Sequence, residues 1–236
     1  MKFIKLYESF EDIHSICEKY NIENYTINSD GTIDVDGDVN FYNQRLTKLP
    51  LRFGNVSGYF ECTHNFLTTL EGCPKSVGSS FACNRNNLIS LEGCPQSVGG
   101  YFACHNNLLT TLEFSPKSVD GYFDCRNNKL TSLEGCSQSV GGSYFNFSNN
   151  LLKDLYGFPE FFDSTIFYSG NPVSDILNLF NRKHKFNRIA KVIDLLNEYG
   201  VIQQEGKEVI LDRLEEIFYM LNMEIPEIRL KNYEVD

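Results

Sequence analysis

Residues 95–112 read PQSVGGYFACHNNLLTTL, and nearly the same string occurs 21 residues earlier and 21 residues later. The earlier copy, residues 74–91, reads PKSVGSSFACNRNNLISL, and the later copy, residues 116–133, reads PKSVDGYFDCRNNKLTSL. A period of this length is typical of a solenoid, in which each repeat forms one coil of the chain. The repeat therefore predicts the fold before any single residue is considered.

Five positions of the repeat keep their residue type from coil to coil. In chain order they are Phe60, Phe81, Phe102, Phe123 and Phe145; Cys62, Cys83, Cys104, Cys125 and Phe147; Asn65, Asn86, Asn107, Asn128 and Asn150; Leu67, Leu88, Leu109, Leu130 and Leu152; and Leu70, Leu91, Leu112, Leu133 and Leu155. Alternate strand residues share a face, and parallel strands stack about 4.8 Å apart. Each position is expected to form an interior column, with asparagine bonding peptide groups where the strand ends.

The pattern F-x-C-x-x-N-x-L-x-x-L resembles the leucine-rich repeat L-x-L-x-x-N/C-x-L over roughly residues 25–176. The short period and the proline of EGCP are most similar to the bacterial subtype found in secreted effectors. The fuller consensus, LTSLEGCPxSVGGYFxCxNN, is similar to repeat proteins encoded by large tailed bacteriophages. Such effectors can carry a C-terminal ubiquitin ligase with a catalytic cysteine, but here the last cysteine is Cys136, so that activity is not carried over.

We expect an α/β repeat fold: a right-handed leucine-rich-repeat solenoid of about six or seven coils with a parallel strand face. Its convex side is expected to be extended or turn-like and mostly non-helical, because each coil has only 21 residues. Residues 1–45 are predicted to form an N-terminal cap, with a helix over about 9–20 and a hairpin around Asn-Ser-Asp-Gly. The solenoid is assigned to 46–172 and a C-terminal helical cap to 173–236, with Gly200 as a helix stop.

The chain has 236 residues and a formal net charge of −10 at pH 7. That charge argues against broad contact with nucleic acid, which needs clustered Lys and Arg, and against an anionic membrane surface. No apolar run approaches the roughly 18 residues of a spanning helix, and the start, MKFIKLYESFEDIH, carries acids too early for a secretory leader. We expect a protein of the cytoplasm, and of the host bacterial cytoplasm if it is phage-encoded.

The eight cysteines follow the repeat and not a metal-ligand spacing. Outside the cysteine column, Cys73, Cys94 and Cys136 share a second position, and Cys17 stands alone. Zinc ligands usually come in close pairs such as C-x2-C, whereas spacing by one repeat is what packing in a stacked core requires. We therefore expect reduced core thiols, and neither a metal nor a cofactor.

Two acidic patterns raise the alternative of a cation site. DVDGDVN (residues 34–40) is similar to a calcium loop, but Val39 occupies the glycine position and Gln44 stands near the final acid. The second pattern is the column Glu71, Glu92, Glu113 and Glu134. Close like charges repel by about 1 kcal/mol per pair in water. We therefore prefer a tight turn with solvated acids and a row of solvent-facing glutamates.

Sequence motifs for catalysis are missing: no G-x-S-x-G elbow, phosphate loop or H-E-x-x-H occurs. The basic segment RKHKFNRIAK (residues 182–191) could contact nucleic acid or an acidic protein surface. Such a run is more often the solvated face of a helix. We expect that this protein is not an enzyme.

The residues that face away from the interior vary freely in charge and size, unlike the core columns, and a stripe of tyrosines runs among them. Tyrosine is enriched among residues that dominate binding energy, and concave solenoid faces serve as binding surfaces. The alternative is that tyrosine is present for its strand propensity. The candidate partner-binding residues are Tyr59, Glu61, His64, Arg85, Tyr101, His105, Tyr122, Asp124, Arg126 and Tyr144.

The sequence thus predicts a non-catalytic protein–protein interaction module that binds its partner on the concave strand face. The phage resemblance implies a partner inside the infected bacterium, either a host defence component or another phage protein. Two alternatives stay open. The chain could be a structural, self-assembling protein that forms a homo-oligomer through its C-terminal helices, or it could bind a small, nucleotide-like ligand in the solenoid curve.

Overall fold

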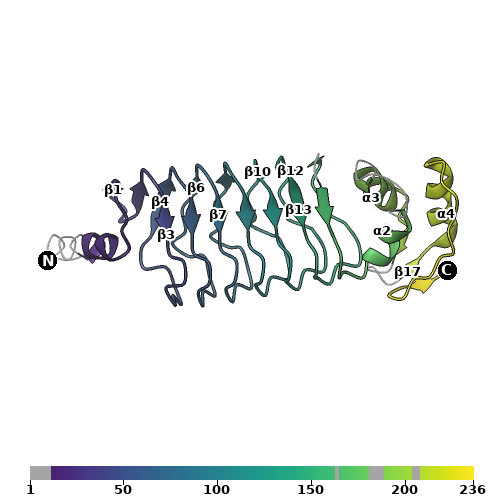
Figure 1. Ribbon diagram of the computed structural model, residues 1–236, viewed down its shortest axis with the longest axis horizontal. Coiled ribbons are helices and arrows are strands. Elements are labelled where there is room, and N and C mark those ends of the chain that lie inside the picture. Colours follow the sequence, from purple (N-terminus) through teal and green to yellow (C-terminus); the bar gives the residue numbers. More distant parts are fainter. Residues whose placement is uncertain (1–11, 163–164, 181–188, 204–207) are drawn as a thin grey trace.

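The protein is an elongated parallel β-solenoid, shown from the side in the computed structural model of Figure 1. The structure describes residues 12–162, 165–180, 189–203 and 208–236. Successive coils stack along the long axis, and each full coil gives one short strand to each of two sheets. The solenoid predicted from the 21-residue period is therefore confirmed.

Sheet B contains the strands that carry the inward phenylalanines. Its pairing is parallel and in register with the repeat, so that Phe81 lies opposite both Phe60 and Phe102. Within the described residues its strands, in chain order, are β3 (Val39–Asn40), β5 (Phe60–Glu61), β7 (Phe81–Ala82), β9 (Phe102–Ala103), β11 (Phe123–Asp124), β13 (Tyr144–Asn146) and β15 (Thr165–Phe167).

Sheet A begins with the predicted N-terminal hairpin and continues with a second strand in each later coil, which was not predicted. Its described strands are β1 (Tyr25–Ile27), β2 (Ile33–Val35), β4 (Phe53–Val56), β6 (Ser76–Val77), β8 (Ser97–Val98), β10 (Ser118–Val119), β12 (Ser139–Val140) and β14 (Phe161–Phe162). Only β1 and β2 pair antiparallel among these strands. A Ser-Val strand is too short to show an alternating pattern, but Val98 is turned inward and is 2% exposed.

The short link between the two strands contains one or two glycines in each central coil, and close stacking explains them. Neither Gly100 nor Gly121 has a positive φ. A Cβ on Gly121 would lie 2.7 Å from the backbone carbonyl carbon of Gly100 and from the nitrogen of Tyr101. Successive corners therefore stack too closely for a side chain.

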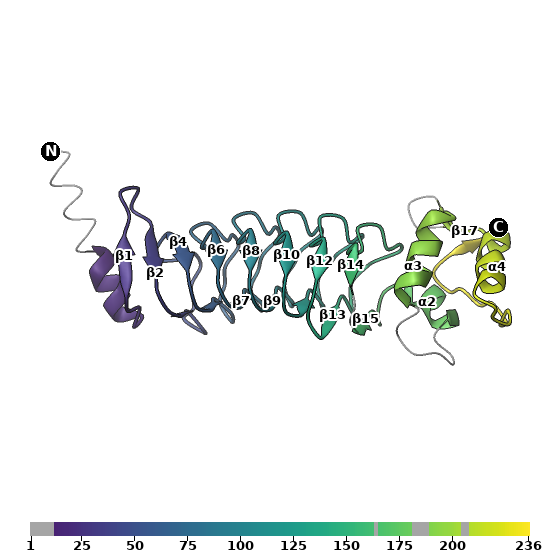
Figure 2. The ribbon, with the colours of Figure 1, turned by 90° about the horizontal axis from the view of Figure 1, so that it is seen from above.

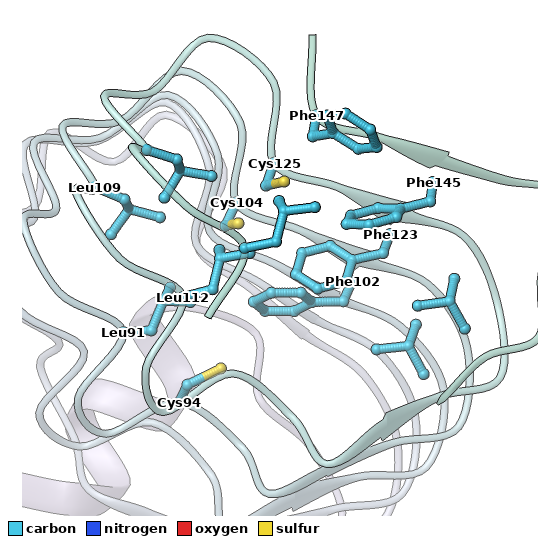
Figure 3. Close-up of a cluster of buried hydrophobic side chains, with 14 of the residues drawn as sticks. Leu91, Cys94, Phe102, Cys104, Leu109, Leu112, Phe123, Cys125, Phe145 and Phe147 are labelled. Carbon is cyan, nitrogen blue, oxygen red and sulfur yellow. The ribbon is translucent and has the colours of Figure 1, made fainter. Parts of the chain in front are cut away.

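The interior contains the predicted columns, part of which Figure 3 shows. Phe102, Cys104 and Leu109 are each 0% exposed. Neighbouring rings of the phenylalanine column are in contact, with centroids 6.0 Å apart for Phe81 and Phe102 and 4.9 Å for Phe102 and Phe123. Burial raises the pKa of the Cys104 thiol, so the sulfur packs as a neutral, apolar group.

Each asparagine of the column joins two coils through hydrogen bonds. The Nδ2 of Asn107 donates to the carbonyls of Cys83 at 3.1 Å and Cys104 at 3.0 Å. Its Oδ1 accepts the backbone N–H of Leu88 at 3.0 Å. Asn86 repeats the pattern one coil earlier and shares the Cys83 carbonyl. An amide suits this position because its NH2 group donates two hydrogen bonds while its carbonyl oxygen accepts a third.

The N-terminal end has a helix over residues 12–19 and then the hairpin of β1 and β2, whose turn includes Gly31 at φ +78°. The chain then enters sheet B through β3, where Val39 and Phe41 are 0% exposed. Tyr20 packs edge-on against Phe41 with ring centroids 5.0 Å apart. The helix and hairpin therefore lie against the first coil, as Figure 2 shows.

The aspartates of residues 34–40 form hydrogen bonds to the next coil of the solenoid. Each accepts a hydrogen bond from the residue one repeat later: Asp34 from the N–H of Asn55 at 2.6 Å, Asp36 from the Ser57 hydroxyl at 2.8 Å, and Asp38 from the N–H of Tyr59 at 2.8 Å. The segment thus stabilises the contact between the first coils.

The C-terminal end contains α2 (Ser174–Phe180), α3 (Ile189–Glu198) and α4 (Leu211–Met220). Gly200 follows α3 with a φ of +55°, as expected of a helix stop. Phe180 stacks on Phe218 at 4.4 Å and so joins α2 to α4. The predicted helices are joined by an unpredicted sheet C, formed by β16 (Ile202–Gln203), β17 (Glu208–Val209) and β18 (Glu234–Val235).

Candidate functional site

The outward side of sheet B carries three stacked tyrosines, Tyr101, Tyr122 and Tyr144, which we call the tyrosine ladder. Each precedes the inward phenylalanine of its coil, so the strand register places the rings over one another. The rings of Tyr101 and Tyr122 are parallel within 2° with centroids 4.6 Å apart, and those of Tyr122 and Tyr144 are within 13° at 4.5 Å. Burial, reinforced by both neighbours, raises the pKa of Tyr122. The ladder therefore presents neutral phenols on an apolar ring surface.

The position between the inward phenylalanine and cysteine is recessed. Ala103 and Asp124 are only 4% and 3% exposed, although strand alternation directs them away from the interior. Asp124 accepts a hydrogen bond from the N–H of Arg126 at 3.2 Å, and its carboxylate lies 3.6 Å from the Arg126 guanidinium. Burial raises the pKa of Asp124 by more than these contacts lower it. Glu61, on an earlier coil, is more exposed and accepts a hydrogen bond from the Thr63 hydroxyl at 2.8 Å.

Where the strands of sheet B end, basic and imidazole side chains occupy four consecutive coils: His64, Arg85, His105 and Arg126. The N–H of Arg85 donates to the carbonyl of His105 at 3.0 Å, which joins two of these coils directly. Of these groups, Arg126, Arg85 and His64 all act electrostatically on His105. The structure therefore gathers the predicted charged residues along one edge of the strand face.

The backbone at His64 and Arg85 is in the left-handed region, with φ of 56° and 57°. The equivalent positions on the next coils are Asn106, Asn127 and Asn149, and asparagine adopts this conformation with less strain than other non-glycine residues. Backbone geometry therefore does not explain the histidine and the arginine. Their presence favours a role for the side chains.

Tyr59, also predicted for the site, is separated from the ladder by Ser80. On the same side of the solenoid, His64 packs edge-on against Tyr42, with ring centroids 4.9 Å apart. The predicted residues thus form two groups, with the ladder and Asp124 on the later coils and Tyr59 and His64 on the earlier ones.

Sequence reasoning missed aromatic residues at both ends of this face. Tyr42 is 47% exposed and occupies, in the first coil, the repeat position of Thr63 and Arg126. Phe167 is also 47% exposed and contacts Tyr144 edge-on at 5.7 Å. Extending the 21-residue register by one coil in each direction places both residues on this face, so the sequence contained the signal needed to find them.

His105 is expected to titrate well below the usual range for histidine. Burial first, and then the nearby Arg126, Arg85 and His64, lower its pKa to about 4. The unfolded chain, with a pKa near 6.5, binds a proton that the folded protein rejects, so stability falls as the pH drops from about 6.5 towards 4. NMR titration of the His105 ring should show a midpoint near pH 4, and His105→Gln should weaken the loss of stability across this window. A midpoint above pH 6 would contradict the burial of this ring.

The four repeat glutamates stay at the surface. Their side chains are exposed, and the backbone N–H of Glu92 donates to the Ser90 hydroxyl at 3.0 Å, a contact repeated at Glu71, Glu113 and Glu134 with the hydroxyl two residues earlier. Among the described residues, no three His, Cys, Asp or Glu side chains meet in a way that could hold a metal ion.

The basic segment 182–191 lies outside the described residues up to residue 188, and so do residues 9–11 of the helix expected over about 9–20. No helix in the described ranges has both the length and the apolar character needed to cross a lipid bilayer.

The strand face offers stacked rings, phenol hydroxyls and an ion pair with one buried partner, Asp124. Groups of these kinds are able to take part in recognition by stacking and hydrogen bonding. No protein-family model, no curated protein and no solved structure matches this chain. The function must therefore be inferred from the geometry of the chain itself.

Proposed function

We propose that this chain is a non-catalytic recognition module of the leucine-rich-repeat type, which binds a protein partner on the outer side of sheet B. The observation that carries the proposal is the tyrosine ladder, whose rings are half-buried and parallel. Rings already fixed by stacking lose little conformational freedom on binding, which is a property of strong anchor residues. The neighbouring Asp124–Arg126 pair adds polar specificity at the same surface.

In this proposal the two ends act as caps for the solenoid. At the N-terminal end Tyr20 covers Phe41. At the C-terminal end Val173 and Ile176 are 0% exposed. Terminal coils of a solenoid need such a cover because their apolar faces lack a neighbouring repeat. The repeat's resemblance to phage-encoded proteins supports a partner inside an infected bacterium, either a host component or another phage protein.

A small-ligand function is favoured by one observation. A cavity of about 470 Å³ lies at the N-terminal end of the strand face, lined by polar groups and by Tyr20, Tyr42 and Tyr59. The volume is in the range of small-molecule sites. The cavity is lined mainly by exposed residues, which is why protein recognition remains the main proposal.

Affinity capture from bacterial lysate tests the main proposal. The double variant Tyr101→Ala/Tyr122→Ala removes two anchors and is expected to weaken partner affinity by about 1,000-fold, since each such anchor contributes about 2 kcal/mol. Tyr156→Ala is the matched control, because Tyr156 is 51% exposed and lies outside sheet B. Equal recovery of every partner by the wild type, the control and the double variant would overturn the proposal.

A further inference from the structure

The tyrosine column is interrupted on one coil. The residue before each inward phenylalanine is Tyr59, Ser80, Tyr101, Tyr122 and then Tyr144. Pairing of Phe60 with Phe81 and of Phe81 with Phe102 places Tyr59, Ser80 and Tyr101 on three consecutive coils. We call the position over Ser80, between the rings of Tyr59 and Tyr101, the ladder gap. Among the described residues, no ring contact joins these two tyrosines.

The size of the ladder gap follows from the strand spacing. Where the column is continuous, successive rings lie 4.5 and 4.6 Å apart, close to the spacing of parallel strands. Two strand steps therefore separate the positions of Tyr59 and Tyr101 by about 9–10 Å. One planar group placed midway would lie at stacking distance from both rings. The gap thus matches a single missing ring in the ladder.

The side chains beneath the ladder gap do not fill it. The Ser80 hydroxyl accepts a hydrogen bond from the backbone N–H of Tyr101 at 3.1 Å, which holds it against the backbone. In the adjacent column, the nearest positions on these coils are Ala82 and Ala103, which are 5% and 4% exposed. Alanine side chains are short, so they do not extend into the ladder gap from the side.

A carboxylate stands at the side of the ladder gap. Glu61 belongs to the same coil as Tyr59, and within the part of the chain that the structure describes it forms no ion pair. Glu61 is close enough to Tyr101 to act on it electrostatically. Burial raises the pKa of Tyr101, and the charges of Glu61 and then of Tyr59 raise this pKa further. The gap is therefore bordered by two electron-rich rings and one anion.

We propose that the ladder gap receives the guanidinium group of an arginine from a basic segment of the protein partner, stacked between Tyr59 and Tyr101 and paired with Glu61. The inference rests on the proposed protein-binding function. A guanidinium is planar, weakly hydrated and attracted to tyrosine faces, whereas a lysine ammonium is a compact charge that cannot stack. A neutral aromatic ring would match the shape but would bring no positive charge to Glu61, whose hydrogen-bond partner here is the Thr63 hydroxyl. The net charge of −10 adds long-range attraction for a basic segment.

Short peptides test the occupant directly. The probe is acetyl-Gly-Gly-Arg-Gly-Gly-amide, and its comparison peptides carry lysine, citrulline or phenylalanine in place of arginine. Titration followed by NMR is expected to show millimolar binding of the arginine peptide and about tenfold weaker binding of the others. Phenylalanine or citrulline peptides that bind as well as arginine would overturn the proposal, as would the absence of arginine-peptide binding. Adenosine as the preferred probe would point to a nucleobase and would also overturn it.

Two variants test the location. Ser80→Tyr fills the gap with tyrosine, the residue at this position in the following coils. The variant should therefore fold with unchanged or higher thermal stability. It should bind the arginine peptide at least about tenfold more weakly, because the peptide's site is occupied. Unchanged affinity would show that the peptide binds elsewhere. Glu61→Gln keeps the shape and removes the charge, so it should lower the preference for arginine over citrulline to the part that comes from stacking of the cation on the two rings, and an unchanged preference would contradict the pairing with Glu61. This second variant decides the question if Ser80→Tyr does not fold.

The two sets of variants distinguish a failure of arginine binding in the ladder gap from a failure of the proposed protein-binding function. If Tyr101→Ala/Tyr122→Ala loses the captured partner while Ser80→Tyr keeps both partner and peptide binding, the strand face binds a partner but the ladder gap does not take arginine. If the double variant retains every partner, the proposed function itself is wrong.

Discussion

Asn107→Asp is expected to lower the free energy of unfolding by about 3–5 kcal/mol at pH 7, the usual cost of a buried charge without compensation. Asn107 is 6% exposed. An aspartate could still accept the N–H of Leu88, but its carboxylate would face the carbonyl oxygens of Cys83 and Cys104, which now receive hydrogen bonds from the amide. Two attractive contacts would become repulsive at once.

The same variant has a predicted pH dependence. Burial and the adjacent carbonyls raise the pKa of the new carboxyl group above its unfolded value of about 3.9. Its defect is therefore smallest below pH 4, where the group is protonated and donates one hydrogen bond, and grows as the pH rises through the folded pKa. Chemical denaturation at several pH values measures both effects.

Asn87→Asp is the matched control for this change. Asn87 belongs to the same type of coil turn but is exposed, so the substitution should alter stability by less than about 0.5 kcal/mol. Equal effects of the two variants would contradict the hydrogen-bonding role of the asparagine column.

Phe102→Ala is expected to cost about 3–5 kcal/mol, the range for removing a fully buried phenylalanine. Phe102 is 0% exposed and contacts Phe81 on one side and Phe123 on the other. A cavity at this place separates two halves of the interior column, and solenoid stability depends on contacts between neighbouring repeats. Thermal and denaturant unfolding should both report a large loss.

An exposed phenylalanine provides the comparison. Phe66 is 55% exposed, so Phe66→Ala should change the free energy of unfolding by less than about 0.5 kcal/mol. Phe102→Leu, which keeps most of the buried volume, should fall between the two alanine variants. A loss for Phe102→Ala no greater than that for Phe66→Ala would contradict the interior column.

Much of the fold could be predicted because a stacked core imposes the same environment on every coil. The columns of Phe102 and Cys104 and the bonding of Asn107 follow from a period and the needs of buried peptide groups. Apart from the predicted hairpin of β1 and β2, the strands of sheet A and sheet C could not be predicted in this way. Val98 is the only inward residue of its two-residue strand, and so short a segment carries no periodic signal.

The sequence proposed residues for the candidate site but did not show how they are arranged. The tyrosine column is visible in the sequence, yet the burial of Asp124 and the strained backbone of His64 and Arg85 became visible only in three dimensions. Tyr42 and Phe167 were missed because the repeat is weakest in the first and last coils, where the register has to be extrapolated.

The sequence by itself determined that the chain coils, with which period, and which side chains lie inside, because equivalent positions in a stacked core must satisfy equivalent packing and hydrogen bonding. Only the tertiary structure decided how the outward residues meet. The parallel stacking of Tyr101 on Tyr122, the pairing of Asp124 with Arg126 and the empty step over Ser80 depend on side-chain directions across neighbouring coils. Those directions are set by contacts in space, which a linear period does not encode.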